Sequence, residues 1–233
     1  MRSARNKDLE LVIDDIADMA RYWSLRKFQY IDAAAEQYEV IVRPAIFEAE
    51  APSIEQITTN NMAFTEWLLF ERPYRRGLSL LALYVDEPPA SLSSAAHERL
   101  SQVRDSIYFS RFSILDKDPD TGVCVLSDTR TGKRYDVYDP HVVEVDRWRD
   151  GVVALHIACV DGAWLTVGQL RLYDVAPAAA TMLDGPGDVH DDDPDNGIDY
   201  ARVSYFLRLL HDVMGVDGRY TSTLKVRSLE PDA

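Results

Sequence analysis

Apolar residues near the start of the chain recur at the spacing of an amphipathic helix. One stripe with a period of about 3.6 residues takes in Leu9, Val12, Ile13, Ile16, Met19 and Ala20. A second helix is expected over about 25–41, ending near Pro44, because proline disfavours helix at the residue before it. Ser53 and Gln56 have capping-box spacing, so another helix should begin there. This pattern predicts a helical region over residues 1–108.

The pattern changes near Phe109, where short runs rich in β-branched and aromatic residues alternate with turn-forming sequences. The five runs are RFSILDKD, GVCVLSD, KRYDVYD, VVALHIACVDG and AWLTVGQLRLYD. Short strands this close together in the sequence predict a small five-stranded antiparallel barrel over residues 109–173. Both SH3-like and OB-like barrels have this strand spacing, and the SH3-like form is our expected fold.

The last part of the chain combines an acidic segment with a second apolar stripe. Residues 174–199 contain eight aspartates and no Lys or Arg, which predicts an acidic linker. Within residues 200–233, a helical stripe takes in Val203, Phe206, Leu207, Leu210, Val213 and Met214. Such a helix is stable only when its stripe docks on the barrel, on the N-terminal helices or on another subunit. The expected fold class is therefore α+β, with a C-terminal amphipathic helix and tail.

Charge and hydropathy narrow the possible partners. The chain has 25 basic and 39 acidic residues, and its net charge of −14 disfavours binding to nucleic acid or anionic lipid. The apolar run at 77–85 is too short to cross a bilayer, and the first fifteen residues lack the apolar core of a signal peptide. We therefore expect a cytoplasmic protein without a membrane segment, in which Cys124 and Cys159 are reduced thiols.

A block of about residues 64–173 resembles a known group of proteins. Its parts are FTEWLLFE, LSLLALYV, FSILDKDPDTGVCVLSDTRTGKRYDVYD and WRDGVVALHIACVDGAWLTVGQLRLY. The order is similar to that of bacterial proteins of unknown function that often carry a SEC-C zinc motif. Asp128, Thr131 and Gly132 match a D-x-x-T-G element, and Asp150–Gly151 matches a second element loosely. The resemblance implies architecture but no activity, and the zinc motif is not carried over, because residues 174–233 contain no Cys.

The segment DVHDDDPDNG (188–197) is the densest group of carboxylates. An EF-hand loop aligned on Asn196–Gly197 places Pro194 and Val203 at two ligand positions, so that motif fails. A solvated linker is the favoured interpretation. The alternative is a divalent-metal site, whose candidate ligands are His190, Asp191, Asp193 and Asp195.

Two groups of basic and aromatic residues are candidate binding sites. Arg72, Arg75 and Arg76 surround Tyr74, where they could hold one phosphate or simply offset a helix dipole. The second group is Trp148 between Arg147 and Arg149, in an expected turn. An exposed tryptophan flanked by arginines is typical of a protein-interface hot spot, so we predict contact with a partner there.

The sequence contains no complete catalytic motif, and we assign no catalytic residue and no cofactor. His156 lies in the apolar run ALHIACV, which favours a hydrogen-bonded core histidine over a catalytic base. The favoured function is a non-catalytic protein-interaction or adaptor module, which contacts a partner protein or self-associates through its C-terminal helix. One alternative is a divalent-metal-dependent hydrolase or nuclease-like enzyme that uses the aspartate cluster. The other is single-stranded nucleic-acid binding through the barrel.

Overall fold

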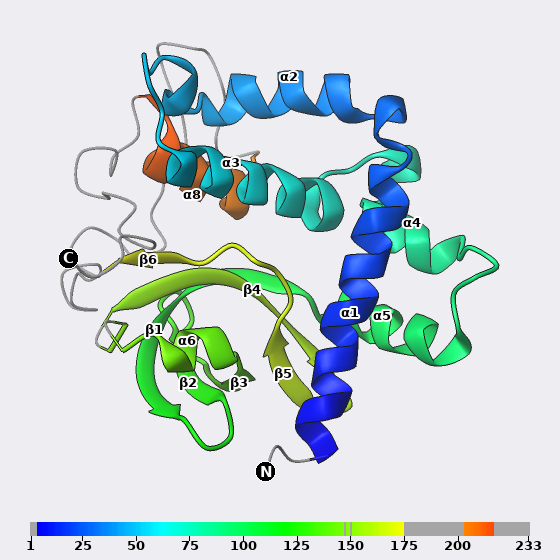
Figure 1. The fold of residues 1–233 in the computed structure, drawn as a ribbon, viewed down its shortest axis with the longest axis vertical. Coiled ribbons are helices and arrows are strands. Elements are labelled where there is room, and N and C mark those ends of the chain that lie inside the picture. The colour runs from blue at the N-terminus through cyan, green and yellow to red at the C-terminus, as the bar shows by residue number, and fades with distance from the viewer. Residues whose placement is uncertain (1–3, 147, 150, 175–202, 217–233) are drawn as a thin grey trace.

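The computed structural model describes residues 4–146, 148–149, 151–174 and 203–216, with helices first and strands after them (Figure 1). The helical elements before the strands are α1 (Ala4–Ser24), η1 (Lys27–Gln29), α2 (Ile31–Val42), η2 (Ala45–Phe47), α3 (Ile54–Glu66), η3 (Trp67–Glu71), η4 (Arg75–Gly77), α4 (Leu80–Asp86) and α5 (Ser94–Ser106). The other described elements are β1 (Tyr108–Asp118), β2 (Val123–Asp128), β3 (Arg134–Tyr138), α6 (Pro140–Glu144), β4 (Val152–Val160), β5 (Ala163–Thr166), β6 (Leu172–Asp174) and α8 (Tyr205–Met214). The predicted α+β class is confirmed.

Short polar side chains set the starts of several helices. The side chain of Ser53 accepts a hydrogen bond from the backbone N–H of Gln56, and the Gln56 side chain accepts one from the N–H of Ser53. The capping box read from the sequence is therefore confirmed at the start of α3. Ser79 and Ser93 cap α4 and α5 in the same way, each through one hydroxyl.

Five strands close into a barrel in the order β1-β2-β3-β5-β4, and β4 pairs back onto β1. All pairs in this ring are antiparallel except β3 with β5, which are parallel. The predicted five-stranded barrel is confirmed, but the prediction that it is antiparallel throughout is wrong. The reason is geometric: strand directions can alternate around a closed ring only when the number of strands is even. A closed ring of five strands therefore contains at least one parallel pair.

The fifth expected strand is divided into two. β5 ends at Thr166, and β6 begins at Leu172 and pairs with the far end of β4. Between them, the backbone N–H groups of Gln169 and Leu170 donate to the side chain of Glu66 rather than to a neighbouring strand. Because a buried side chain takes up these donors, the sheet ladder is interrupted at this point.

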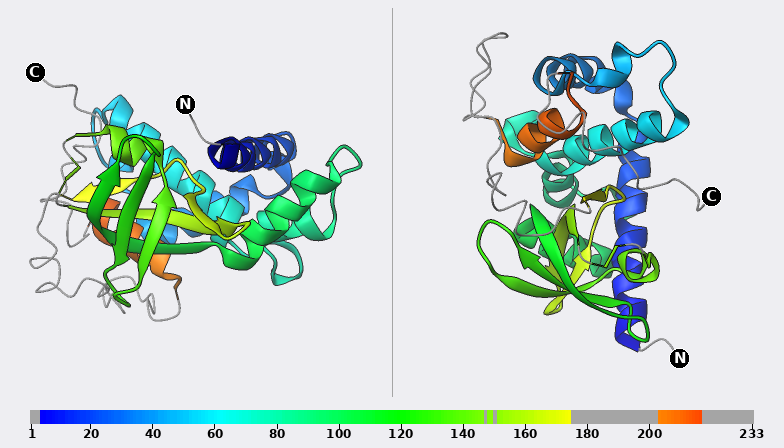
Figure 2. Two further views of the ribbon diagram at one scale, coloured as in Figure 1. Left: turned by 90° about the horizontal axis from the view of Figure 1, so that it is seen from below. Right: turned by 90° about the vertical axis from the view of Figure 1, so that its left-hand side faces the viewer.

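The helices and the barrel have two adjoining apolar cores. One lies inside the barrel and includes Phe112, Leu126 and Leu155. The other lies between the helices and the outer surface of β4 and β5, where α5 packs on β4. Figure 2 shows α2, α3 and α8 as a layer on one side of the barrel, with α1 running past both.

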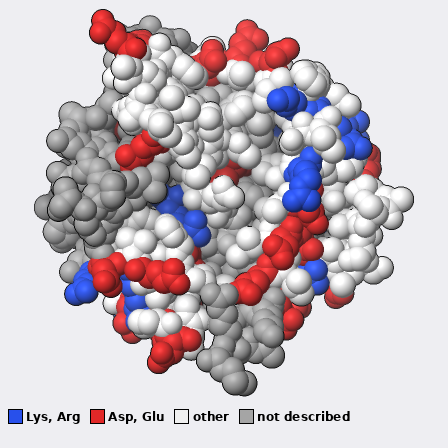
Figure 3. All heavy atoms as spheres, viewed as in Figure 1, with Lys and Arg blue, Asp and Glu red and all other residues white. Residues whose placement is uncertain are grey.

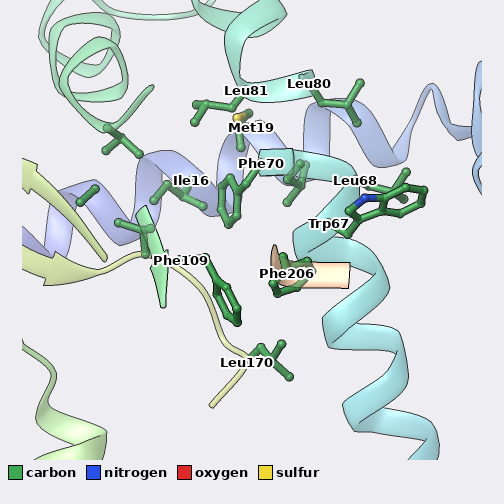
Figure 4. Packing of buried hydrophobic residues seen from close by; sticks show 14 of the residues in the cluster. Ile16, Met19, Trp67, Leu68, Phe70, Leu80, Leu81, Phe109, Leu170 and Phe206 are labelled. Atoms are coloured by element: carbon green, nitrogen blue, oxygen red, sulfur yellow. The ribbon is translucent and has the colours of Figure 1, made fainter. Parts of the chain in front are cut away.

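The helix α8 packs against this chain through its apolar stripe. Phe206, Leu207, Leu210 and Val213 are buried, and α8 contacts α2, β1 and η3. Phe206 meets Phe109 of β1 at a ring-centre distance of 4.6 Å, as Figure 4 shows from close by. The stripe thus docks on both the helical region and the barrel.

Among the described helices, none combines the length and the apolar character needed to cross a bilayer.

Candidate functional site

The three arginines around Tyr74 each interact with a different part of the chain. Arg72 donates to the side chain of Gln37, and burial lowers the pKa of its guanidinium. Arg75 lies over the ring of Tyr74, and Arg76 forms an exposed ion pair with Glu87. Their guanidinium groups are therefore directed to separate partners rather than toward one phosphate position.

Trp148 lies in the barrel core and not on the surface. Its side chain is 1 % exposed and stacks on Tyr173 at a ring-centre distance of 5.1 Å. The expectation of an exposed hot-spot tryptophan is wrong, because the turn before β4 directs this ring into the barrel although its neighbours in sequence are polar. Arg149 stays exposed and pairs with Asp146, whereas Arg147 lies outside the described residues.

The candidate metal ligands His190, Asp191, Asp193 and Asp195 also lie outside the described residues. Within the part of the chain that is described, no group of three or more His, Cys, Asp or Glu side chains is arranged to hold a metal ion. The metal site therefore stays a prediction from the sequence.

The structure assembles a buried cluster of charged side chains that the sequence did not indicate. Glu66 is the last residue of α3, and Glu71 is the last residue of the π-helical turn η3. In an α-helix, residues five apart point about 140° away from each other. A π turn closes its hydrogen bonds from i to i+5, here from the N–H of Arg72 to the carbonyl of Trp67, and it brings Glu66 and Glu71 to one side.

Both carboxylates of this cluster bind the imidazole of His156 on β4. Nδ1 of His156 lies 2.9 Å from Oε2 of Glu66, and Nε2 lies 3.2 Å from Oε1 of Glu71. The second oxygen of Glu66 accepts the backbone N–H groups of Gln169 and Leu170, at 2.6 and 2.5 Å. Glu66 thereby joins α3, β4 and the connection between β5 and β6.

The imidazole of this cluster is shielded from solvent and is protonated. His156 is fully buried, and the rings of Phe70, Phe109 and Phe206 lie around it with centres 4.9–5.2 Å away. Burial by itself lowers the pKa of His156, but the hydrogen bonds to two carboxylates outweigh it and raise the pKa above its usual value. Two acceptors on one ring require two N–H donors, which only the charged form has. No ring nitrogen is left to exchange a proton with a substrate, so the geometry supports a structural role.

A raised histidine pKa makes stability depend on pH. The folded protein keeps a proton on His156 that the unfolded chain releases near pH 6.5. The free energy of unfolding is therefore expected to be highest below pH 6.5. It should fall as the pH rises through the raised pKa, by up to about 1.4 kcal/mol per pH unit. Urea denaturation between about pH 5 and pH 9 would measure this change.

His141 provides the matched control for this pH profile, because its pKa is lowered by burial and by the nearby Arg171. A lowered pKa adds stability that is present above pH 6.5 and is lost as the pH falls. The variant His141→Gln should thus change the profile only on the acid side. Two results would contradict the role given to His156. One is a wild-type free energy of unfolding that does not fall above pH 6.5, and the other is the loss of that fall in His141→Gln.

A half-open cavity of about 510 Å³ lies beside the cluster. Its walls are α1, the side of α3 that carries Thr58, Met62 and Thr65, and the connection 166–171. Glu66 and Phe70, both buried, also line it. The cavity thus connects the charged cluster with the molecular surface.

The burial of His156 agrees with the prediction of a hydrogen-bonded core histidine. The two glutamates were missed, because they lie 90 and 85 residues away along the chain. The available signal was the pair of acids at the ends of the apolar run EWLLFE, at a spacing that does not fit an amphipathic α-helix. Cys124 is buried in the barrel core, and burial raises its pKa to about 12.

Comparison with known proteins gives no match: no family model, no curated protein sequence and no solved structure matches this chain. The functional argument therefore depends on the residues and on their geometry.

Proposed function

We propose that this protein is a non-catalytic protein-interaction module. The observation that carries the proposal is a set of exposed apolar side chains within residues 40–57: Val40 in the last turn of α2, Phe47 in η2, and Ile54 and Ile57 in the first turn of α3. Ile54 is 84 % exposed, and Phe47 and Val40 are 59 % and 56 % exposed. Apolar side chains that gather on a surface mark sites where partners bind, because covering them removes apolar area from water. We call this set the α2–α3 surface.

The charges around the α2–α3 surface define the chemistry of the partner. Exposed glutamates lie at positions 36, 39, 48 and 50, and Arg43 is the only basic residue between positions 36 and 55. In Figure 3 the region over α2 and α3 is largely white with acidic patches at its rim, and basic groups lie toward one end. We therefore propose a partner protein whose contact surface has an apolar centre and a basic rim.

The burial of the apolar stripe of α8 argues against self-association through the C-terminal helix. Self-association through α8 would need a free apolar stripe, whereas Phe206, Leu207 and Leu210 are buried against the rest of the chain. No feature of the described residues favours the metal-dependent hydrolase, whose candidate ligands at 190–195 lie outside them.

The barrel supports an OB-type fold better than an SH3-like one. Its ring order β1-β2-β3-β5-β4 with one parallel pair, and the helix α6 between β3 and β4, fit a Greek-key barrel rather than a simple meander. OB-type barrels bind oligonucleotides over the second and third strands. Here the outward side chains of Asp116 and Asp136 flank Val125 on that face, which disfavours a phosphate backbone.

We propose that the protein is located in a bacterial cytoplasm. The resemblance of residues 64–173 to bacterial proteins associated with the SEC-C motif supports the origin. The free thiols of Cys124 and Cys159 support a reducing compartment.

Photo-crosslinking followed by affinity measurement would test the proposed function. Benzoylphenylalanine placed at Phe47 in the living cell should capture a partner, which is then purified and titrated by calorimetry. We expect Ile54→Ser to weaken its binding at least about tenfold, because such exposed apolar residues become hot spots when covered. Phe28→Ser is the matched control, since Phe28 is 86 % exposed on η1, outside the α2–α3 surface.

Three results would overturn the proposal. The first is a captured protein that binds the Ile54→Ser variant with unchanged affinity. The second is a product consisting only of this chain crosslinked to itself, which would indicate an interface between copies. The third is no product at Phe47 under conditions in which benzoylphenylalanine at Phe28 captures a protein.

A further inference from the structure

We infer that the cavity beside Glu66 binds a small, uncharged molecule that has one apolar face and hydrogen-bonding groups on the other. Its volume of about 510 Å³ lies within the range of small-molecule sites, roughly 300–1,000 Å³. The face drawn in Figure 3 is hollowed between the upper helices and the barrel, where the cavity opens. This site is separate from the α2–α3 surface, and the inference does not depend on the protein-interaction role.

One wall of the cavity is apolar. It is formed by Ile13, Ile16, Ala17 and Ala20, which share one face of α1. Ile13 is 45 % exposed and Ala17 is exposed as well, so this wall can be reached from solvent. The small alanine side chains leave room that longer residues would fill.

The opposite wall offers uncharged hydrogen-bonding groups. Asn61 and Thr65 lie on one face of α3, and Gln169 lies on the connection across from them. No described residue forms a hydrogen bond with the side chains of these three, so they are available to a ligand. Thr166 also lines the cavity, is only 4 % exposed, and its hydroxyl has no hydrogen-bond partner within the described chain. Because the Thr166 hydroxyl is closed off from solvent, the polar groups that a ligand in the cavity reaches are the exposed side chains of Asn61, Thr65 and Gln169.

The charged residues of the lining already have partners within the chain. Glu66 is bound by His156 and by two backbone N–H groups, as described above. Arg171 forms an ion pair of 2.8 Å with Asp139, whose side chain is fully buried. Neither group is left to balance a ligand charge, and protonated His156 between two carboxylates leaves a net charge of −1 beside the cavity. This negative charge disfavours an anion. A cation would find no free carboxylate either, because Glu66 is the only acidic residue in the described lining and both of its oxygens are taken up. An uncharged ligand is therefore favoured.

A matched pair of fluorescent probes tests the site and its preference. N-phenyl-1-naphthylamine is uncharged, largely apolar and has one N–H donor, and we expect it to bind with a Kd on the order of 10 μM. The probe 8-anilino-1-naphthalenesulfonate has the same skeleton and an added sulfonate. It should bind at least about tenfold more weakly, because the negative cluster opposes it.

Substitutions on the cavity wall locate the bound probe. Ala17→Phe should close the cavity and weaken binding of the uncharged probe at least about tenfold, whereas Ala33→Phe, at an exposed alanine of α2, should have no effect. Thr65→Tyr blocks the opposite wall and replaces the first variant should that one fail to fold. Phe47→Ser serves as a further control, because it removes apolar area from the α2–α3 surface and should leave probe binding unchanged.

Different results would overturn the binding site and the preference for an uncharged ligand. Unchanged probe binding in folded Ala17→Phe and Thr65→Tyr, or no binding to the wild type, would overturn the inference. Equal or tighter binding of the sulfonate would overturn the assignment of an uncharged ligand. None of these results bears on partner capture through Phe47, so the two proposals fail independently.

Discussion

Replacing Glu66 with alanine is expected to lower the free energy of unfolding by about 3–5 kcal/mol. The substitution removes the acceptor for the charged imidazole of His156 and for two backbone N–H groups, and the imidazole and the N–H of Leu170 stay buried. Removing one partner of a buried ion pair is strongly destabilising, because Glu71 alone does not satisfy both nitrogens of the imidazole, and each N–H left without an acceptor adds to the loss. Urea denaturation at about pH 6, where His156 is protonated in the folded protein, would measure the difference.

Glu71→Ala is the matched control, because it removes the other carboxylate of the same imidazole. The Glu71 side chain is 26 % exposed, and from the described residues it accepts one hydrogen bond, at 3.2 Å from His156. Water can replace part of this interaction, so the expected loss is about 1 kcal/mol. Equal losses in the two variants would show that the backbone contacts of Glu66 contribute little, and they would contradict the role proposed for it.

The local parts of this fold could be predicted from the sequence because their causes are local. The capping box at Ser53 involves residues three apart, and the stripe of α1 follows from one helical period. The strands β1 to β4 were found from short β-branched runs between turns. The burial of His156 followed from its apolar neighbours within a single strand.

The features that were missed depend on contacts between distant parts of the chain. The parallel pair of β3 and β5 follows once five strands close into a ring, and strand runs alone do not show whether a sheet closes. Trp148 was misplaced because its flanking arginines indicate exposure, while the barrel interior that receives its ring is formed by other strands. Glu66 and Glu71 face one way only because η3 is a π turn, which the helical period does not reveal.

The cavity beside Glu66 could not be predicted from the sequence for the same reason. The cavity takes its apolar wall from α1 and its polar wall from α3 and the connection 166–171, so its lining residues lie up to 158 positions apart, from Ile13 to Arg171. The exposed residues of the α2–α3 surface differ in this respect, because they lie on one continuous segment. Their exposure still depends on which faces of α2 and α3 the core takes up.

Gly168→Ala should be nearly as destabilising as the loss of Glu66, with an expected decrease of about 3 kcal/mol in the free energy of unfolding. A β-carbon at position 168 would overlap the carboxyl group of Glu66. That carboxyl group cannot move aside easily, because His156, Gln169 and Leu170 hold both of its oxygens. The substitution therefore displaces a buried ion or the connection that binds it, and thermal and urea denaturation would measure the loss.

Gly132→Ala separates this steric effect from the ordinary cost of replacing a glycine. Gly132 has a φ of +71° and nothing within 4 Å of the added β-carbon, so only backbone strain of about 1 kcal/mol is expected there.

A double-mutant cycle tests whether the loss in Gly168→Ala depends on the carboxyl group of Glu66. In a Glu66→Ala background the carboxyl group is gone, and adding Gly168→Ala should lower stability by less than about 1 kcal/mol. Additive losses would mean that the glycine is required for another reason, and that Glu66 does not determine the path of the chain between β5 and β6.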